Sequence, residues 1–265
     1  MGTNVVSEIQ RDYVFNLIRG GKRYDGRRFD EYRPFKVVTN VVQQAEGSSR
    51  VQLGGTDVFC GVKMQPGTPY PDSPNSGTMS TAAELIPMAS PTFEPGPPRP
   101  DAIELSRVVD RGLREAKTVD VEKLVITPGE KVWVMFVDFH IVDYDGNLYD
   151  ACSLAGIAAM LTTTVPMKKH GFGEDHPLPV ENYPVMTTAM KVGPGIVWDP
   201  GLTEDQVGGP RLSVSTDQNG HIRAMQKGMR GGFTQDEVLS ILREAPRKGQ
   251  ELRESLFKQL GVSPK

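Results

Sequence analysis

The sequence predicts an α+β protein of two similar halves, in which mixed sheets are backed by helices. Two observations lead to this prediction. Strand-like and helical patterns follow one another in the order β-β-β-β-α-β-β-α and then β-β-β-β-α. The chain is also long enough, at 265 residues of which 38% are hydrophobic, to bury a core in one large or two smaller domains.

The overall charge and the cysteines exclude some classes of protein. A net charge of −3 argues against bulk attraction to nucleic acid or membranes, although a local basic stripe remains compatible with it. The sequence has neither the apolar run of a signal peptide nor a stretch that could span a bilayer. Cys60 and Cys152 lack metal-like spacing and favour a reducing setting. We therefore expect a cytoplasmic protein without a cofactor or metal.

The first half begins with an amphipathic helix at residues 5–19, which Gly20 and Gly21 end. A dense charged segment at residues 23–33 follows, around an Asp-Gly turn. From its chemistry alone we favour a solvated loop. The alternative is an ordered loop whose arginines pair with carboxylates or phosphates.

The strands of the first half are predicted from β-branched and alternating runs. They are expected at residues 35–44, 49–53, 57–64, 78–88, 124–127 and 131–142. Gly54-Gly55-Thr56 predicts a tight hairpin turn with a positive φ. The strand at residues 131–142 is apolar on both faces and is predicted to be sandwiched between layers, with His140 as a core histidine.

A proline-rich stretch at residues 90–100 is expected to be extended and exposed. Asp101 then starts a helix, with Glu104 at the capping-box position. The helix is expected to run to about residue 117, with an apolar stripe on one side.

Three arginines are stacked on the opposite side of that helix, Arg107, Arg111 and Arg114. We call them the arginine row. The residues alone favour a solvated face paired with carboxylates of the same helix. The alternative is a row of phosphate contacts, toward which the all-arginine composition leans.

After the strand at residues 131–142, an Asp-Gly turn leads into small residues that open a helix at residues 150–162. Either Asp150 or Ser153 is expected to cap it, which would leave backbone N–H groups for an anion. Yet residues 132–167 contain no Arg or Lys, so the charge that would complete a phosphate site is absent.

The second half follows a loop rich in Pro, Gly and His at residues 166–184. Its strands are expected at residues 183–192, 195–199, 211–216 and 222–228, with a hairpin at Asn219-Gly220. A capping box at residues 234–237 opens a helix that Pro246 is expected to break or kink, and residues 251–260 are again helical. We predict two domains, residues 1–175 and 180–265.

Several of these features occur together, in order, in one known family. They are Arg23-Tyr24-Asp25-Gly26-Arg27 with Glu31 and Arg33, the Gly54-Gly55-Thr56 hairpin, Glu104 with the arginine row, and Asp150-Ala151-Cys152-Ser153. This set resembles the ribonuclease PH family of phosphorolytic exoribonucleases, and is most similar to the non-catalytic subunit of the archaeal exosome core. The resemblance implies a ribonuclease-PH-like fold of two βαβα-type halves, similar to domain 2 of ribosomal protein S5.

The resemblance also implies a mechanism for active relatives. Phosphate attacks the 3′-terminal phosphodiester of RNA, held by a hydroxyl, backbone N–H groups and an arginine, while a carboxylate of the second half serves acid catalysis or metal binding. Here Ser153 keeps the hydroxyl of a degenerate phosphate site, but Leu154 replaces the arginine. Arg211 or Leu212 stands where the active Asp is expected, and Asp205 alone matches the earlier acid. The resemblance therefore implies a catalytically inactive chain.

By the same resemblance, the chain would alternate with a catalytic ribonuclease-PH-like partner in a hexameric ring, a trimer of heterodimers. RNA-binding cap proteins and single-stranded RNA would be further partners, with no membrane. Arg107, Arg111 and Arg114 would contact RNA, with Arg111 the first choice. The alternatives are a phosphorolytic exoribonuclease active on its own, and a structural scaffold whose arginines pair only with protein carboxylates.

Overall fold

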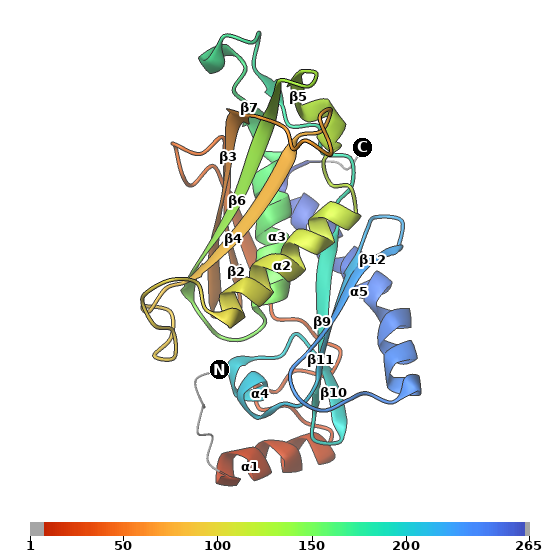
Figure 1. The fold of residues 1–265 in the computed structure, drawn as a ribbon. Coiled ribbons are helices and arrows are strands. Elements are labelled where there is room, and N and C mark those ends of the chain that lie inside the picture. The colour runs from red at the N-terminus through yellow and green to blue at the C-terminus, as the bar shows by residue number, and fades with distance from the viewer. Residues whose placement is uncertain (1–7, 263–265) are drawn as a thin grey trace.

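Two β-sheets and the helices between and behind them form the layers of the computed structural model, which describes residues 8–262 (Figure 1). The helices are α1 (Glu8–Arg19), α2 (Pro100–Glu115), α3 (Leu148–Leu161), α4 (Leu202–Val207) and α5 (Gln235–Leu260). The strands of the first sheet are β1 (Phe35–Thr39), β2 (Gly47–Leu53), β3 (Thr56–Gly67), β4 (Thr78–Leu85), β5 (Val125–Thr127) and β6 (Lys131–Asp143). A small pair, β7 (Thr164–Val165) and β8 (His176–Pro177), links them to β9 (Val185–Val192), β10 (Gly195–Trp198), β11 (Arg211–Thr216) and β12 (Ile222–Gly228).

The order of the layers is first sheet, α2 and α3, second sheet, α5 (Figure 1). The first sheet has the order β1-β2-β3-β6-β4, with β5 paired to β6, and only β4 and β6 are parallel. The second sheet has the antiparallel order β10-β9-β11-β12. This arrangement confirms the predicted α+β class with mixed sheets backed by helices.

The hairpin between β2 and β3 confirms the predicted turn. Leu53 lies opposite Thr56, and Gly54 between them has a φ of +58°. Glycine is needed there for a second reason, because a Cβ on Gly54 would lie 2.4 Å from Cδ of Arg33. The turn therefore leaves room for an arginine from the N-terminal segment.

Strand β6 is covered on one face only, so the prediction of a strand sandwiched between layers is wrong. Trp133, Phe139 and their alternate neighbours are buried on one face, where Phe139 lies beside Gly156 of α3 and Trp133 beside the rings of His170 and Phe172. Phe136 and His140 are half-buried on the other face. Figure 1 shows no helix of the described chain on that face. His140 is not a core histidine, because 44% of its side chain is exposed. Its Nδ1 lies 3.2 Å from Oε2 of Glu84 on β4. Aromatic and β-branched residues suit a half-buried pleated surface, so their presence does not imply a covering layer.

Helix α3 is apolar all round because it lies between the two sheets. Its residues from Tyr149 to Met160 are all buried. The small side chains allow close approach: the hydroxyl of Ser49 on β2 donates to the carbonyl of Ala155 at 2.7 Å. A Cβ on Gly47 would lie 2.6 Å from the carbonyl oxygen of Ala159.

The sequence predicts that Pro246 breaks or kinks this helix. Helix α5 runs without interruption through Pro246, so the break is wrong, and the kink stays a prediction. The helix has buried residues on both sides of the proline, among them Ala245 and Leu252. It packs against the second sheet and against β1, the edge strand of the first sheet. Burial of this continuous stripe outweighs the missing hydrogen bond, whose cost is roughly 3 kcal/mol. The predicted capping box is confirmed, with Glu237 N 3.3 Å from Oγ1 of Thr234.

Both ends of the described chain pack against the other half. Val14 and Ile18 of α1 join a cluster with Met190 of β9 in the second sheet, and the side chain of Gln259 bonds the backbone of β1. The division at residues 175–180 stays a prediction. No helix of the described residues is long and apolar enough to cross a membrane.

Candidate nucleic-acid interface

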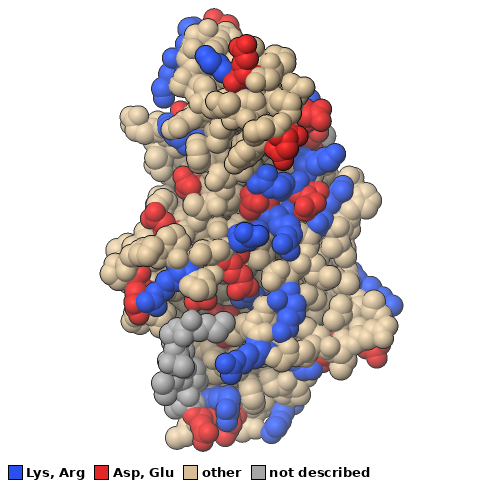
Figure 2. Space-filling view, viewed as in Figure 1, with Lys and Arg blue, Asp and Glu red and all other residues tan. Residues whose placement is uncertain are grey.

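Helix α2 presents the arginine row on the surface. Leu105, Val109 and Leu113 are buried on one side, toward β4 and the core, as the sequence pattern predicts. Arg107, Arg111 and Arg114 are all exposed on the other. Figure 2 shows Lys and Arg side chains gathered on the face over α2 and β12, so a locally basic surface exists on a chain of net charge −3.

The three guanidinium groups of the row differ in their partners. Arg114 pairs with Asp110, with Nη2 2.9 Å from Oδ1, and donates to the carbonyl of Met79 at 2.8 Å. Arg107 and Arg111 form no hydrogen bond or ion pair with any residue between 8 and 262. Pairing within the helix therefore accounts for Arg114, whereas the other two arginines of the row are exposed cations without a counter-charge in the described part of the chain.

The start of α2 differs from the prediction. Arg99 is the N-cap without a side-chain cap bond, and Pro100 is the first helical residue. Glu104 is not part of a capping box. It accepts instead from Nη2 of Arg211 on β11, at 2.9 Å. A long-range partner has replaced the local one that the spacing predicted.

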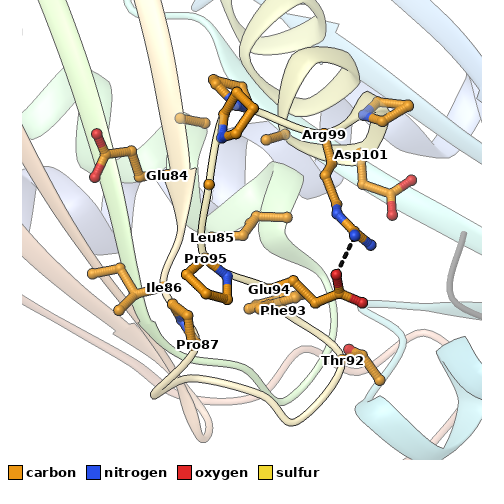
Figure 3. Close-up of a pocket in the computed structure, with 16 residues that line it drawn as sticks. Glu84, Leu85, Ile86, Pro87, Thr92, Phe93, Glu94, Pro95, Arg99 and Asp101 are labelled. Carbon is orange, nitrogen blue, oxygen red and sulfur yellow. Dashed lines mark hydrogen bonds and ion pairs between the residues drawn. The ribbon is translucent and has the colours of Figure 1, made fainter.

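The proline-rich segment before α2 is exposed, as predicted, but it curls instead of running extended. Phe93 N donates to the carbonyl of Ser90 at 3.0 Å, and the segment encloses a cavity of about 400 Å³ against the end of β4 (Figure 3). Figure 3 shows the ion pair of Arg99 and Glu94 beside it. Glu84 and Asp101 add further negative charge to the lining, which does not suit a phosphate.

At the start of α3, the carboxylate of Asp150 is buried and hydrogen-bonded to protein groups. The helix begins at Leu148 with Asn147 as N-cap, not at the predicted Asp150 or Ser153. Asp150 is fully buried and accepts from the hydroxyl of Tyr32 at 2.9 Å and from Asn147 Nδ2 at 2.8 Å. Its carboxylate therefore faces the protein interior.

Ser153 and Leu154 also face the interior. Ser153 is 4% exposed, and its hydroxyl accepts from the backbone N–H of Met186 on β9, at 3.0 Å. Leu154 is fully buried in the main core. Neither side chain is presented to solvent, so both serve the contact between α3 and the sheets on either side.

Residues from four elements converge beside the first turn of α3. Arg211 lies over the ring of Tyr149, with Cζ 4.0 Å from the centroid, and donates to its hydroxyl at 2.8 Å. The Tyr144 hydroxyl donates to Asp205 of α4. Burial raises the pKa of Asp205, while the bond from Tyr144 and the charge of Arg211 lower it. The structure thus brings Asp205 and Arg211 together. The guanidinium of Arg211 lies between Tyr149, at the start of α3, and Glu104 of α2.

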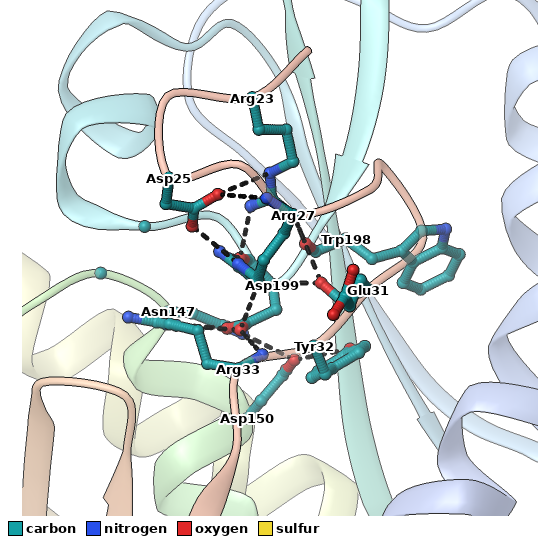
Figure 4. A network of polar contacts seen from close by, with 12 residues as sticks. Arg23, Asp25, Arg27, Glu31, Tyr32, Arg33, Asn147, Asp150, Trp198 and Asp199 are labelled. Carbon is teal, nitrogen blue, oxygen red and sulfur yellow. Dashed lines mark hydrogen bonds and ion pairs between the residues drawn. The ribbon is translucent and has the colours of Figure 1, made fainter. Parts of the chain in front are cut away.

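The charged N-terminal segment is an ordered polar network, not the solvated loop that we favoured (Figure 4). Arg23 is 2% exposed and holds Glu204 through two hydrogen bonds. Arg33 forms a two-point contact with Asp199, at 2.7 and 2.9 Å. The alternative of arginines paired with carboxylates is the correct one.

Two buried carboxylates of this network differ in pKa. Burial would raise the pKa of Asp199, but the hydrogen bonds and charge of Arg33 hold it below its ordinary value. Burial raises the pKa of Asp150 to about 7, against the lowering effect of bonds from Asn147 and Thr188. Asp199 thus serves as the anion to which two arginines bind, whereas Asp150 binds a proton at mildly acidic pH.

Sequence reasoning missed the roles of Glu104, Tyr149 and Tyr144 around Arg211 and Asp205. It also missed α4, whose six residues lie in a Gly-rich stretch without an apolar period. Their partners come from distant positions, so spacing gives no signal. For the N-terminal segment a signal existed, because four arginines stand among carboxylates within residues 23–33.

Comparisons with known proteins agree with this architecture. Residues 31–166 match domain 1 of the 3′ exoribonuclease family and residues 182–247 match its domain 2. The chain is 50% identical over 256 residues to the exosome complex component Rrp42 of Methanocella arvoryzae. The aligned region covers 97% of this chain and 98% of that protein.

Two solved structures are also similar. A chain of the Archaeoglobus fulgidus exosome with RNA bound to the active site superposes with a TM-score of 0.92 at 48% identity, covering 94% of this chain and 98% of that one. A chain of an archaeal exosome core gives 0.88 at 44% identity, covering 94% and 96%. Both family domains and high identity over nearly the whole length are therefore found, and the chain belongs to the 3′ exoribonuclease (ribonuclease PH) family.

Proposed function

We propose that this chain is a non-catalytic subunit of an archaeal exosome, the 3′-to-5′ RNA-degrading complex, acting in the cytoplasm. It contributes arginines to the RNA path and structures the active site of a catalytic ribonuclease-PH-like partner. The two would alternate in a hexameric ring, a trimer of heterodimers, to which RNA-binding cap proteins attach. The likeness to Rrp42 proteins and to exosome chains over nearly the whole length supports this assignment.

One observation carries the RNA-contacting part of the proposal. Arg107 and Arg111 lie exposed on α2 without a protein counter-charge among the described residues. Both guanidinium groups keep their donors available, and RNA offers a phosphate to each. Arg114 completes the row in our proposal, with a smaller share because it is held by Asp110.

The absence of catalysis is supported by what occupies the degenerate site. The hydroxyl of Ser153 is engaged by the backbone of β9, and Leu154 supplies no charge. Arg211 or Leu212 stands where the resemblance expects a carboxylate, and the guanidinium of Arg211 binds Glu104. A phosphate and a general acid would therefore have no place to act in this chain.

Reversing two charges of the arginine row tests the RNA contact. In the assembled ring without inorganic phosphate, Arg107→Glu with Arg111→Glu should weaken binding of a single-stranded oligoadenylate about 10–100-fold, because two phosphate contacts become repulsive. The log–log salt slope should become shallower by ~1.4. Fluorescence anisotropy at several salt concentrations measures both quantities.

The matched control reverses Arg243 and Arg247, two exposed arginines of α5 on the other side of the second sheet. It makes the same change in net charge and should change the affinity by less than about twofold. Equal losses for both double variants would mean that only the net charge matters. An intact ring with unchanged affinity after the α2 reversal would favour the purely structural scaffold.

A further inference from the structure

We propose that Arg211 is a positioning residue, which withholds Glu104 from Arg107 and so keeps the arginine row available to RNA. The inference rests on the proposed function and deepens it. It gives a role to the arginine that lies beside the first turn of α3.

The carboxylates of α2 that lie within reach of Arg107 are held elsewhere. Glu104 stands three residues before Arg107, at a spacing where side chains on a helix meet. Its Oε1 is instead bound by Arg211, 2.9 Å away. Asp110, three residues after Arg107, accepts from the hydroxyl of Thr81 at 3.0 Å and from Arg114. Each acid that would neutralise Arg107 therefore has another partner.

Arg211 is built into its place more firmly than a surface arginine. Its side chain is 12% exposed and is stacked on Tyr149, whose hydroxyl accepts a second hydrogen bond. The absence of a side chain at Gly228 makes room for it, since a Cβ there would lie 2.4 Å from Nη2 of Arg211. The pair with Glu104 is thus fixed from β11, β12 and α3 together.

Removing Arg211 would leave Glu104, whose side chain is 35% exposed, with the neutral hydroxyl of Tyr149 as its remaining neighbour, and would allow it to turn toward the charge of Arg107. A carboxylate beside Arg107 competes with an RNA phosphate for the same donors. The loss would appear as weaker RNA binding, although Arg211 itself makes no contact with RNA in this proposal. The effect should vanish when Glu104 carries no charge.

The test measures oligoadenylate affinity in the assembled ring without inorganic phosphate. Arg211→Met should lower the affinity about three- to tenfold and flatten the salt slope by ~0.7, the equivalent of one phosphate contact. Adding Glu104→Gln should restore the affinity to within about twofold of the original. In the Arg211→Met background, Arg107→Ala should cost less than it does alone, because the two changes remove the same contact. Arg247→Met, a single charge removed from α5, is the matched control.

If the ring does not assemble with Arg211→Met, Gly228→Ala is the second variant. Its Cβ would lie 2.4 Å from Nη2 of Arg211 and 3.2 Å from Oε1 of Glu104, so it separates the pair by crowding and should give the same loss and the same rescue. An unchanged affinity for Arg211→Met, or a loss that Glu104→Gln does not rescue, overturns the positioning role. That result is distinct from failure of the proposed function, in which Arg107→Ala with Arg111→Ala would leave the affinity unchanged in the original chain.

Discussion

Replacing Asp199 with asparagine is expected to lower the free energy of unfolding by about 3–5 kcal/mol. Asp199 is fully buried, and its carboxylate receives Arg33, Arg27 and Asn147 at 2.7–3.0 Å. The neutral amide leaves the buried guanidinium of Arg33 without its main counter-charge. Asparagine is the appropriate replacement because the backbone at residue 199 has a φ of +50°, which asparagine tolerates. Urea unfolding at pH 7 measures the change.

A matched carboxylate at the edge of the same network provides the control. Asp25 is paired with Arg27, with Oδ2 2.7 Å from Nε, but 37% of its side chain is exposed. Asp25→Asn should therefore cost less than about 1 kcal/mol. A similarly small loss for Asp199→Asn would show that the network does not hold the N-terminal segment against the second half.

The second large effect concerns pH. Burial raises the pKa of Asp150 from 3.8 to about 7, so the folded state holds a proton there that the unfolded state releases above about pH 4. The stability from this group is fully present below pH 4 and is lost as pH rises through 7, a total on the order of 4 kcal/mol. Other carboxylates, such as Asp199, have lowered pKa values and act in the opposite sense.

Asp150→Asn isolates this contribution. When Asp150 is protonated, its Oδ1 can donate to Oγ1 of Thr188 at 2.7 Å, which lies 2.9 Å from Oγ of Ser213. An asparagine amide reproduces that pattern without a titration. We expect the variant to match the original chain at pH 4 and below and to be the more stable of the two at pH 8, by chemical unfolding at both values.

Equal destabilisation of Asp150→Asn at both pH values would contradict this account. It would mean that the four donors around Asp150 keep the carboxylate ionised throughout the range.

Local patterns predicted the elements of this fold well. The Gly54 hairpin, the amphipathic α2 and the capping box of α5 follow from turn chemistry, a 3.6-residue period and N-cap spacing. Where local and tertiary interactions compete, the prediction failed. Glu104 has the capping-box spacing, yet the charge of Arg211 binds it from another sheet. Pro246 should break a helix, yet a continuous buried stripe holds α5 together.

The candidate site shows the same limit. The arginine row was readable from spacing, since residues 107, 111 and 114 share one helix face. The sequence could not predict which of the three arginines lack an ion pair. That depends on the partners of Glu104 and Asp110, and the partner of Glu104 comes from a distant strand. The anion-binding site considered at the start of α3 would need access to solvent. Asp150 and Ser153 are buried, so an anion cannot reach it.

The central claim is that this chain supports RNA degradation without performing it. The most direct measurement is release of nucleoside diphosphate from single-stranded RNA in the presence of inorganic phosphate, by the purified chain alone and by its complex with a catalytic ribonuclease-PH-like partner. We expect no phosphate-dependent release by the chain alone and sustained release by the complex. Release by the chain alone, abolished by Ser153→Ala or Asp205→Asn, would contradict the account.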